Sequence, residues 1–280
     1  MRTVSLDAVR DTVRKLYIDA CYRLNDDMRK ALKEATKTEV NPQGKEILQM
    51  ISDNADVAEK EWLPICQDTG LAVVYIELGE EVRFDRPGLK EAINQGVSQA
   101  CKEGLLRASV AKDPLRRGNT GDNTPAIIHL DIVPGDKMKI TVGAKGTGSE
   151  NMSRMKLLTP SAGMDGVKNF VLETVTQGGS NPCPPLVVGV GIGGNLETVA
   201  EIAKKSLYRL LNEKNKDPYY AKLEEDWLKE INKTGVGPEG LGGSTTALAV
   251  HIEALPCHIG ALPVAVNLDC HAHRHKEAVL

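Results

Sequence analysis

The sequence is poor in aromatic residues, in excess charge of either sign and in long apolar runs. Its 280 residues include two tryptophans, two phenylalanines and six tyrosines, and 35 basic residues nearly balance 38 acidic ones. Such a balance gives no electrostatic field suited to nucleic acid or to anionic lipid. No apolar run approaches the roughly 20 residues needed to span a bilayer. We therefore expect neither a nucleic-acid partner nor a membrane.

The N-terminal segment also lacks the apolar core of a secretory signal. It reads MRTVSLDAVRDTVRKL, which is too charged for that role. We therefore expect a cytoplasmic protein, and in that reducing compartment the six cysteines are not expected to form disulfides. Buried, metal-bound or catalytic thiols are the alternatives. The length suits one large or two small domains.

Helical periodicity dominates the first hundred residues. Apolar residues recur at three- and four-residue steps in Leu6–Ala20, Asp26–Glu39 and Gly44–Glu61, and Leu89–Arg107 continues this pattern. Between them, Leu71–Leu78 is an apolar, β-branched run typical of a buried strand.

After residue 107, glycine- and proline-rich loops alternate with shorter elements. The pattern predicts helices at 164–177, 195–211 and 219–231, and strands at 126–133, 137–142, 186–190, 246–252 and 262–267. No repeat or linker divides the chain. We predict a mixed α/β fold over 1–280: a helical N-terminal part followed by an α/β part with a small mixed sheet and glycine-rich loops. A subdivision into 1–107 and 108–280 is left open.

The cysteines differ in local context. Cys21 and Cys101 lie inside helical patterns, where a thiol acts as a small buried hydrophobe. Cys66, Cys183 and Cys270 sit instead at breaks between elements, in CQDTG, NPCPP and DCHAH. Their wide separations exclude a local zinc knuckle. Three thiolates from loops would suit a [4Fe–4S] cluster with one open iron, and three unrelated buried thiols are the alternative.

Five of the six histidines lie between His251 and His275. They offer a zinc site or an acid–base histidine, but a solvated C-terminal tail is the simpler interpretation of His271, His273 and His275. His258 follows a proline and a cysteine between two expected strands. An ordinary imidazole titrates near physiological pH, which suits proton transfer.

Two further patterns and one carboxylate are ambiguous. Gly189–Gly194 matches GxGxxG, but no second strand ending in an acidic residue follows, so a tight strand-to-helix turn is favoured over a dinucleotide site. The loops after Arg107 and around Lys145 mix basic residues with glycine, asparagine and threonine, which suits a small carboxylate or phosphate. Asp68 is either a loop-capping carboxylate or a general base.

Six motifs in succession resemble the class I, iron–sulfur fumarate hydratases. They are CQDTG at 66–70, NTGDNTPAIIH at 119–129, AKGTGSEN at 144–151, NPCPP at 181–185, GLGGSTTAL at 240–248 and PCHIGALPVAVNLDCHAHRH at 256–275. The resemblance is greatest to the alpha subunit of the two-subunit form, shared with L(+)-tartrate dehydratase. Single-chain members carry a further C-terminal domain, so the resemblance implies a separate beta subunit here.

The resemblance implies which cysteines hold the cluster. Cys66, Cys183 and Cys270 fall on the three ligand positions of the family, whereas Cys257 matches none. The open iron of such a cluster would act as a Lewis acid towards the hydroxyl and carboxylate of a small dicarboxylate substrate.

The resemblance also implies substrate-binding and catalytic positions. Gln67 and Asp68 match residues that contact the substrate, and Asp68 is implicated in proton handling. Arg107 resembles the arginine that holds a substrate carboxylate, and Gly148 a glycine whose backbone touches the substrate. His258 matches the active-site histidine. The remaining catalytic groups of the family belong to the beta part.

We therefore expect the alpha subunit of a [4Fe–4S]-dependent hydro-lyase that reversibly hydrates fumarate to (S)-malate, active together with a beta subunit in a hetero-oligomer. An L(+)-tartrate dehydratase alpha subunit is the alternative. Hypotheses of other classes are a zinc-dependent hydrolase built from the His- and Cys-rich C terminus, and a non-catalytic assembly module whose glycine-rich loops dock a partner.

Overall fold

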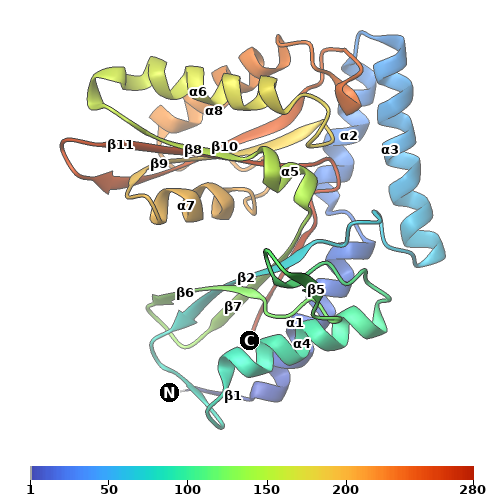
Figure 1. Cartoon of the computed structure of the whole chain (residues 1–280), viewed down its shortest axis with the longest axis vertical. Coiled ribbons are helices and arrows are strands. Elements are labelled where there is room, and N and C mark those ends of the chain that lie inside the picture. Colours follow the sequence, from blue (N-terminus) through green and yellow to red (C-terminus); the bar gives the residue numbers. More distant parts are fainter. Residues whose placement is uncertain (1) are drawn as a thin grey trace. The chain divides into compact units, whose positions relative to one another are not determined.

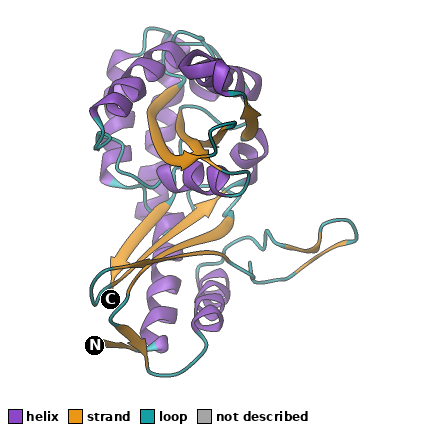
Figure 2. Cartoon of the chain, turned by 90° about the vertical axis from the view of Figure 1, so that its left-hand side faces the viewer, coloured by secondary structure: helices purple, strands orange, loops and turns teal. Residues whose placement is uncertain are grey.

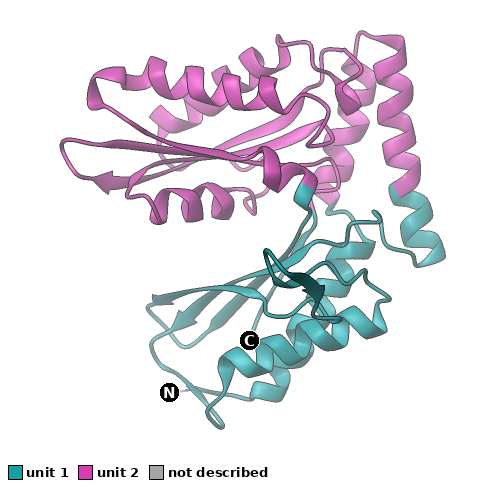
Figure 3. Cartoon of the chain, viewed as in Figure 1, with its two compact units in different colours: residues 1–25, 55–147, 274–280 teal, residues 26–54, 148–273 magenta. Residues whose placement is uncertain are grey.

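The computed structural model describes residues 2–280 and divides the chain into two compact units (Figure 3). Unit 1 comprises residues 1–25, 55–147 and 274–280, and unit 2 comprises 26–54 and 148–273. Each unit is therefore assembled from separate stretches of the chain, different from the ranges 1–107 and 108–280 considered for the sequence. The mixed α/β class is confirmed in both units.

Unit 1 is built on a four-stranded mixed sheet with the strand order β12-β7-β2-β6. Strand β2 pairs in parallel with β6 and antiparallel with β7, which in turn pairs antiparallel with β12. Two helices, α1 and α4, pack against each other beside this sheet (Figures 1 and 2). The elements of unit 1 are β1 (Arg2–Val4), α1 (Leu6–Tyr22), β2 (Leu71–Gly79), β3 (Val82–Phe84), α4 (Leu89–Glu103), β4 (Ala111–Asp113), β5 (Arg117–Asn119), β6 (Ile127–Val133), β7 (Met138–Lys145) and β12 (His275–Val279).

The core of unit 1 follows from the helical periodicity of its sequence. Ser5 caps α1 by accepting a hydrogen bond from the Asp7 N–H, and the apolar stripe of the helix is buried against α4 and the sheet. Cys21 and Cys101 lie inside this core, as predicted. Burial raises the pKa of the Cys21 thiol to about 12, so it stays protonated and unreactive.

Unit 2 is a three-layer α/β/α structure around a sheet of order β10-β9-β11-β8. Helices α6 and α8 cover one face and α7 the other (Figure 1). Strands β9 and β10 are parallel, and β11 is antiparallel to both β9 and β8. The elements are α2 (Asp26–Thr38), α3 (Pro42–Glu61, which ends in unit 1), α5 (Thr147–Met152), β8 (Arg154–Leu158), α6 (Gly163–Gly178), β9 (Leu186–Gly194), α7 (Thr198–Ser206), α8 (Pro218–Asn232), β10 (Ala247–Cys257) and β11 (Leu262–Asp269).

Several short elements were not predicted from the sequence. Strands β1, β3, β4, β5, β8 and β12 lie where no strand was expected. The helix expected at 195–211 is shorter, at Thr198–Ser206, and β7 continues beyond residue 142 to Lys145. Among residues 2–280, no helix combines the length and the apolar character that crossing a membrane requires.

The GxGxxG run lies inside a strand rather than at a strand-to-helix turn. Its first two glycines, Gly189 and Gly191, are in β9, where α7 packs closely against the strand backbone. A Cβ atom at Gly189 would lie 2.2 Å from the carbonyl oxygen of Ala203, and one at Gly191 would lie 2.3 Å from that of Val199. The glycines therefore permit the close approach of a helix to a strand.

Gly189→Ala is expected to lower the free energy of unfolding by about 3 kcal/mol or more, because α7 must move away from the sheet. Urea unfolding measures this loss. The matched control is Gly235→Ala, where a Cβ meets no atom within 4 Å and only the left-handed φ of 73° opposes the change, at about 1–2 kcal/mol. Equal losses in the two variants would contradict the packing explanation.

Candidate active site

The predicted site residues are divided between the two units. Unit 1 contains Cys66, Gln67, Asp68 and Arg107, and unit 2 contains Gly148, Cys183, Cys257, His258 and Cys270. Each group is described within its own unit.

The Cys66–Gly70 loop of unit 1 connects α3 to β2 and is anchored by buried polar groups. The N–H of Ile65 donates to the carbonyl of Cys21 (2.9 Å), and the Tyr17 hydroxyl donates to the Gly70 carbonyl (3.0 Å). At Gly70 the φ angle is 77°, and a Cβ there would lie 2.7 Å from the backbone carbonyl of Lys145. Glycine is thus required where this loop meets the end of β7. Cys66 itself is half-buried.

Asp68 is held in this loop by hydrogen bonds to both carboxylate oxygens. Oδ1 accepts from the Gly70 N–H (3.1 Å), and Oδ2 accepts from the N–H (2.9 Å) and the hydroxyl (3.3 Å) of Thr147. Burial alone would raise the pKa of Asp68, but these donors and the nearby Arg274 guanidinium outweigh it and leave the pKa below its ordinary value. Asp68 is therefore an ionised, loop-capping carboxylate at neutral pH.

Arg107 lies beside the same loop. Its backbone carbonyl accepts from the Thr69 hydroxyl (3.1 Å) and from Nδ2 of Asn123 (2.9 Å), while its side chain is exposed. The structure thus places three of the predicted residues, Gln67, Asp68 and Arg107, on adjoining segments of unit 1. An exposed guanidinium next to a fixed backbone can bind a carboxylate through two parallel hydrogen bonds.

Arg274 was not predicted from the sequence as a site residue, although the CHAHRH motif contains it. It is 4% exposed, and its Nη1 donates to the backbone carbonyl of Asp68. Its own carbonyl accepts from the Ala144 N–H (2.9 Å), which fixes it beside β7. A single arginine in a histidine-rich segment gives no periodic signal, so only the fold reveals that it supports the Asp68 loop.

In unit 2, the loops that carry Cys183 and Cys270 lie next to each other. The N–H of His271 donates to the carbonyl of Cys183 (3.2 Å). Cys183 adopts a left-handed φ of 55°, which is unusual for a residue with a side chain. Both cysteines are half-buried, unlike the two core cysteines.

Glu239 connects these two loops, and it was not predicted as a site residue. Its N–H donates to the Pro184 carbonyl (2.8 Å), and its Oε1 lies 3.0 Å from Nε2 of His271. Glu239 also has a left-handed φ, of 51°. Backbone strain of this kind persists where the surrounding contacts hold it in place.

Gly148 and His258 occupy other loops of unit 2. Gly148 is the second residue of α5, and a Cβ there would lie 3.1 Å from the carbonyl oxygen of Asn181, two residues before Cys183. His258 is exposed in the turn between β10 and β11, where its Nδ1 accepts from the Gly260 N–H (3.0 Å). Nδ1 is therefore the acceptor nitrogen, and Nε2 carries the proton in the neutral ring.

The C-terminal histidines do not form the solvated tail favoured by the sequence. His273 is 1% exposed and its Nδ1 lies 2.9 Å from Oδ2 of Asp269, and His275 is 4% exposed in β12, opposite Gly143 of β7. His275 is in the strand β12 that pairs with β7, although the two strands are far apart in sequence. Only His271 is partly exposed, and it contacts Glu239.

The thiols have the chemistry that a cluster requires. None of the six cysteines, all in the described residues, forms a disulfide. Cys66, Cys183 and Cys270 are half-buried on irregular segments, and soft thiolates in such places are the usual ligands of iron–sulfur clusters. Within either unit of the described chain, no three His, Cys, Asp or Glu side chains gather to hold a metal ion.

Cys257 has a different environment. It is exposed at the end of β10, and its Sγ lies 3.3 Å from the carbonyl oxygen of Ala261.

A cavity of about 190 Å³ in unit 2 contains none of the predicted site residues. Glu150, Arg154 and Asn267 are among its lining residues. Glu150 is paired there with Lys204 (2.6 Å), and Oδ1 of Asn267 is buried without a hydrogen-bond partner.

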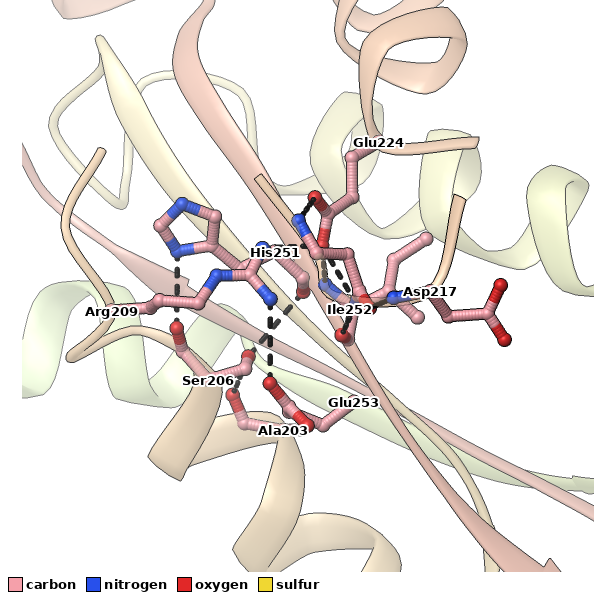
Figure 4. A network of polar contacts seen from close by, with 9 residues as sticks. Ala203, Ser206, Arg209, Asp217, Glu224, His251, Ile252 and Glu253 are labelled. Atoms are coloured by element: carbon pink, nitrogen blue, oxygen red, sulfur yellow. Dashed lines mark hydrogen bonds and ion pairs between the residues drawn. The ribbon is translucent and has the colours of Figure 1, made fainter. Parts of the chain in front are cut away.

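A buried polar network joins α7, α8 and β10 (Figure 4). Arg209 pairs with Glu224 and, at 3.3 Å, with Glu253. Glu224 also accepts from the Ile252 N–H (2.7 Å), and Nδ1 of His251 lies 3.0 Å from the Ser206 carbonyl. The carbonyl can only accept, so Nδ1 carries the proton in the neutral ring.

His251 is expected to make unit 2 sensitive to acid. Burial, followed by the charges of Arg209 and His273, lowers its pKa from 6.5 to about 3. Between these values the unfolded chain binds a proton that the folded chain does not, so stability falls as pH falls, by about 1.4 kcal/mol per pH unit at most. Above pH 6.5 this contribution does not vary.

We expect His251→Gln to flatten the loss of stability between pH 6.5 and pH 4, measured by urea unfolding at several pH values. Glutamine retains a donor for the Ser206 carbonyl and cannot gain the proton. A variant with the same pH slope as the parent protein would show that other groups control acid unfolding.

Comparison with known proteins places the chain beside one group of relatives. Residues 10–279 match the family model of fumarate hydratase (fumerase). A protein of Methanocaldococcus jannaschii named "Putative L(+)-tartrate dehydratase subunit alpha" is 41% identical over 272 residues, which cover 95% of both chains. The L(+)-tartrate dehydratase alpha subunits of Escherichia coli strains UTI89 and K12 are 36% and 35% identical over 257 residues, covering 90% of this chain and 84% of theirs.

Proposed function

Because this chain belongs to the fumarate hydratase family, a family of hydro-lyases, we propose that it is the cluster-binding alpha subunit of an iron–sulfur hydro-lyase acting on a four-carbon dicarboxylate. Residues 1–280 would serve as one cluster-binding domain in the cytoplasm. The observation that carries the proposal is the match to the family model over nearly the whole chain. Three half-buried thiols on irregular segments support it.

We propose Cys66, Cys183 and Cys270 as the cluster ligands. When bound, a [4Fe–4S] cluster with three thiolate ligands supplies an iron with an open position, which serves as a Lewis acid towards a hydroxyl or carboxylate oxygen. The hydrogen bond from the His271 N–H to the Cys183 carbonyl joins the Cys183 and Cys270 loops. Together with the contact of Glu239 with His271, it would keep two of these thiols in place.

The other residues would bind the substrate and move protons. The Arg107 guanidinium would hold a terminal carboxylate, with Gln67 and the backbone of Gly148 as further contacts. Asp68 is ionised at neutral pH, so in the dehydration direction it would accept a proton. His258 would serve as a proton donor or relay.

A beta subunit is the proposed partner, in a hetero-oligomer. The curated relatives are named as alpha subunits, and this name implies a second chain in those proteins. In the proposed arrangement Arg107 holds one carboxylate of the substrate, and no cationic side chain of this chain is assigned to the other carboxylate. The partner would supply that second cationic side chain.

Fumarate, in equilibrium with (S)-malate, is the proposed substrate, in line with the family model. L(+)-tartrate is the second candidate, because the relatives carry that name. Both are small diacids that an arginine and loop amides can hold, and they differ in hydroxyl groups rather than in charge.

The test is co-expression with a beta-type subunit, followed by anaerobic assays of both substrates side by side. We expect hydration of fumarate to exceed dehydration of L(+)-tartrate in kcat/KM. The reverse ranking would assign the chain to tartrate. Activity on neither, from a complex that holds iron and sulfide, would overturn the proposed substrate class.

A further inference from the structure

We propose that two copies of this chain associate through strand β6 of unit 1, pairing antiparallel about Leu130. Strand β6 ends the sheet order β12-β7-β2-β6, and no other strand in residues 2–280 pairs with its outer side. Such an edge is a template for another strand.

The edge is unusually apolar for one exposed to solvent. Strand β6 reads IIHLDIV, with Leu130 50% and Ile132 72% exposed. Sheets normally protect an exposed edge with proline or with charged residues, especially lysine. The opposite edge of the same sheet does so, since β12 reads HKEAV. Strand β6 contains neither lysine, arginine nor proline.

The exposed side chains continue the buried apolar layer of unit 1. In the β2–β6 register, Ile128, Leu130 and Ile132 lie beside Val74, Ile76 and Leu78 respectively, and the residues of β2 belong to the core or pack against it. Neighbouring residues of paired strands share a face of the sheet. The apolar row therefore runs to the sheet edge instead of ending in polar residues.

The sequence of β6 is complementary to itself in one register. Antiparallel pairing centred on Leu130 sets Leu130 opposite its own copy, Ile128 opposite Ile132, and Ile127 opposite Val133. On the other face it sets His129 of each copy opposite Asp131 of its partner, an attractive pair when the imidazole is protonated and a hydrogen-bonding pair when it is not.

The neighbouring registers are poorer. Centring on His129 would oppose Ile127 and Asp131 and stack two imidazoles, and centring on Asp131 would oppose two carboxylates. A shift by one residue would place the apolar face of one copy against the polar face of the other. The single favourable register is symmetric, so the contact closes as a two-fold dimer with an eight-stranded sheet.

Sedimentation velocity of the full chain, alone and with its beta subunit, tests the contact. We expect Leu130→Lys to raise the dissociation constant for pairing of two copies at least about tenfold, because two ammonium groups would meet on the two-fold axis. Leu115→Lys is the matched control: Leu115 is 90% exposed between β4 and β5, outside the proposed contact, and its replacement should change nothing.

A second pair of variants tests the register without weakening the strand. With Leu130→Cys, mild oxidation should link two copies, and mass spectrometry should find the peptide joined at position 130 on both sides. With Ile132→Cys, the two thiols would be about 13 Å apart along the strands, too far for a disulfide. The parent chain controls for its native thiols.

Three results would overturn the proposal. One is a chain that stays monomeric with and without the beta subunit. Another is equal cross-linking of the Leu130→Cys and Ile132→Cys variants. The third is a Leu130→Lys variant that no longer binds the beta subunit although its two copies still pair. In that case β6 would be the contact for the beta subunit instead.

Discussion

Serine in place of Cys66, Cys183 or Cys270 is expected to abolish cluster binding in each case, with loss of iron, of acid-labile sulfide and of the visible charge-transfer absorption. Serine retains the size of cysteine but offers an alcohol, a poor ligand for the iron of such a cluster. With only two thiolates left, hydro-lyase activity should be undetectable. The measurement is iron and sulfide content after anaerobic reconstitution of the full chain with its beta subunit.

The controls are the cysteines with other environments. Cys257→Ser should retain the cluster, because this exposed thiol lies outside the proposed ligand set. Cys101→Ser should also retain it, with some loss of stability from the buried hydroxyl. If Cys257→Ser removed the cluster and Cys270→Ser did not, the ligand assignment in unit 2 would be wrong.

Asp68→Asn is expected to lower kcat by about 10²- to 10⁴-fold, the usual contribution of a positioned general base. The amide cannot accept a proton from carbon. It would also place an N–H₂ group against the N–H and hydroxyl of Thr147, in place of the present acceptor. The cluster content of the variant should equal that of the parent, which separates the loss of a base from the loss of the cluster.

The matched control is Asp122→Asn. Asp122 caps a loop in the same unit, with Oδ1 accepting from the N–H (3.2 Å) and the hydroxyl (2.6 Å) of Thr124, and its pKa is also lowered, chiefly by that hydroxyl. Both changes should cost stability. Only Asp68→Asn should affect kcat, and comparable kcat values in the two variants would leave Asp68 as a loop cap alone.

The lowered pKa of Asp68 also implies a pH dependence of stability. The pKa of Asp68 is lower in the folded chain than the ordinary value of 3.8, so its ionised form stabilises unit 1 above that value. This contribution disappears as the pH falls through the lowered folded value. At neutral pH the carboxylate is therefore available as a base.

Local patterns predicted much of the fold because they reflect local physics. The long helices were predicted to within a few residues, since apolar side chains recur with helical spacing in α1, α2, α3 and α6. Strand β8 was missed although Arg154 and Lys156 alternate with apolar residues, because a strand of five residues gives only a short pattern. Strand β12 was missed because its pairing with β7 joins residues more than a hundred positions apart.

In the candidate site, too, features with a local sequence signal could be predicted and features that depend on distant contacts could not. The cysteine loops could be selected from the sequence because glycine and proline mark breaks in the chain, and the family resemblance then implied the roles proposed for them. The supporting residues could not. Arg274 and Glu239 act through contacts with segments distant in sequence, and no local spacing distinguishes either from a surface charge.

Metal and sulfide analysis of the anaerobically prepared alpha–beta complex shows whether this chain holds an iron–sulfur cluster for hydro-lyase chemistry. We expect about four iron atoms and four acid-labile sulfides per alpha chain. Zinc bound to the complex, with neither iron nor sulfide, would contradict this expectation and favour the hydrolase interpretation of the C-terminal histidines and cysteines.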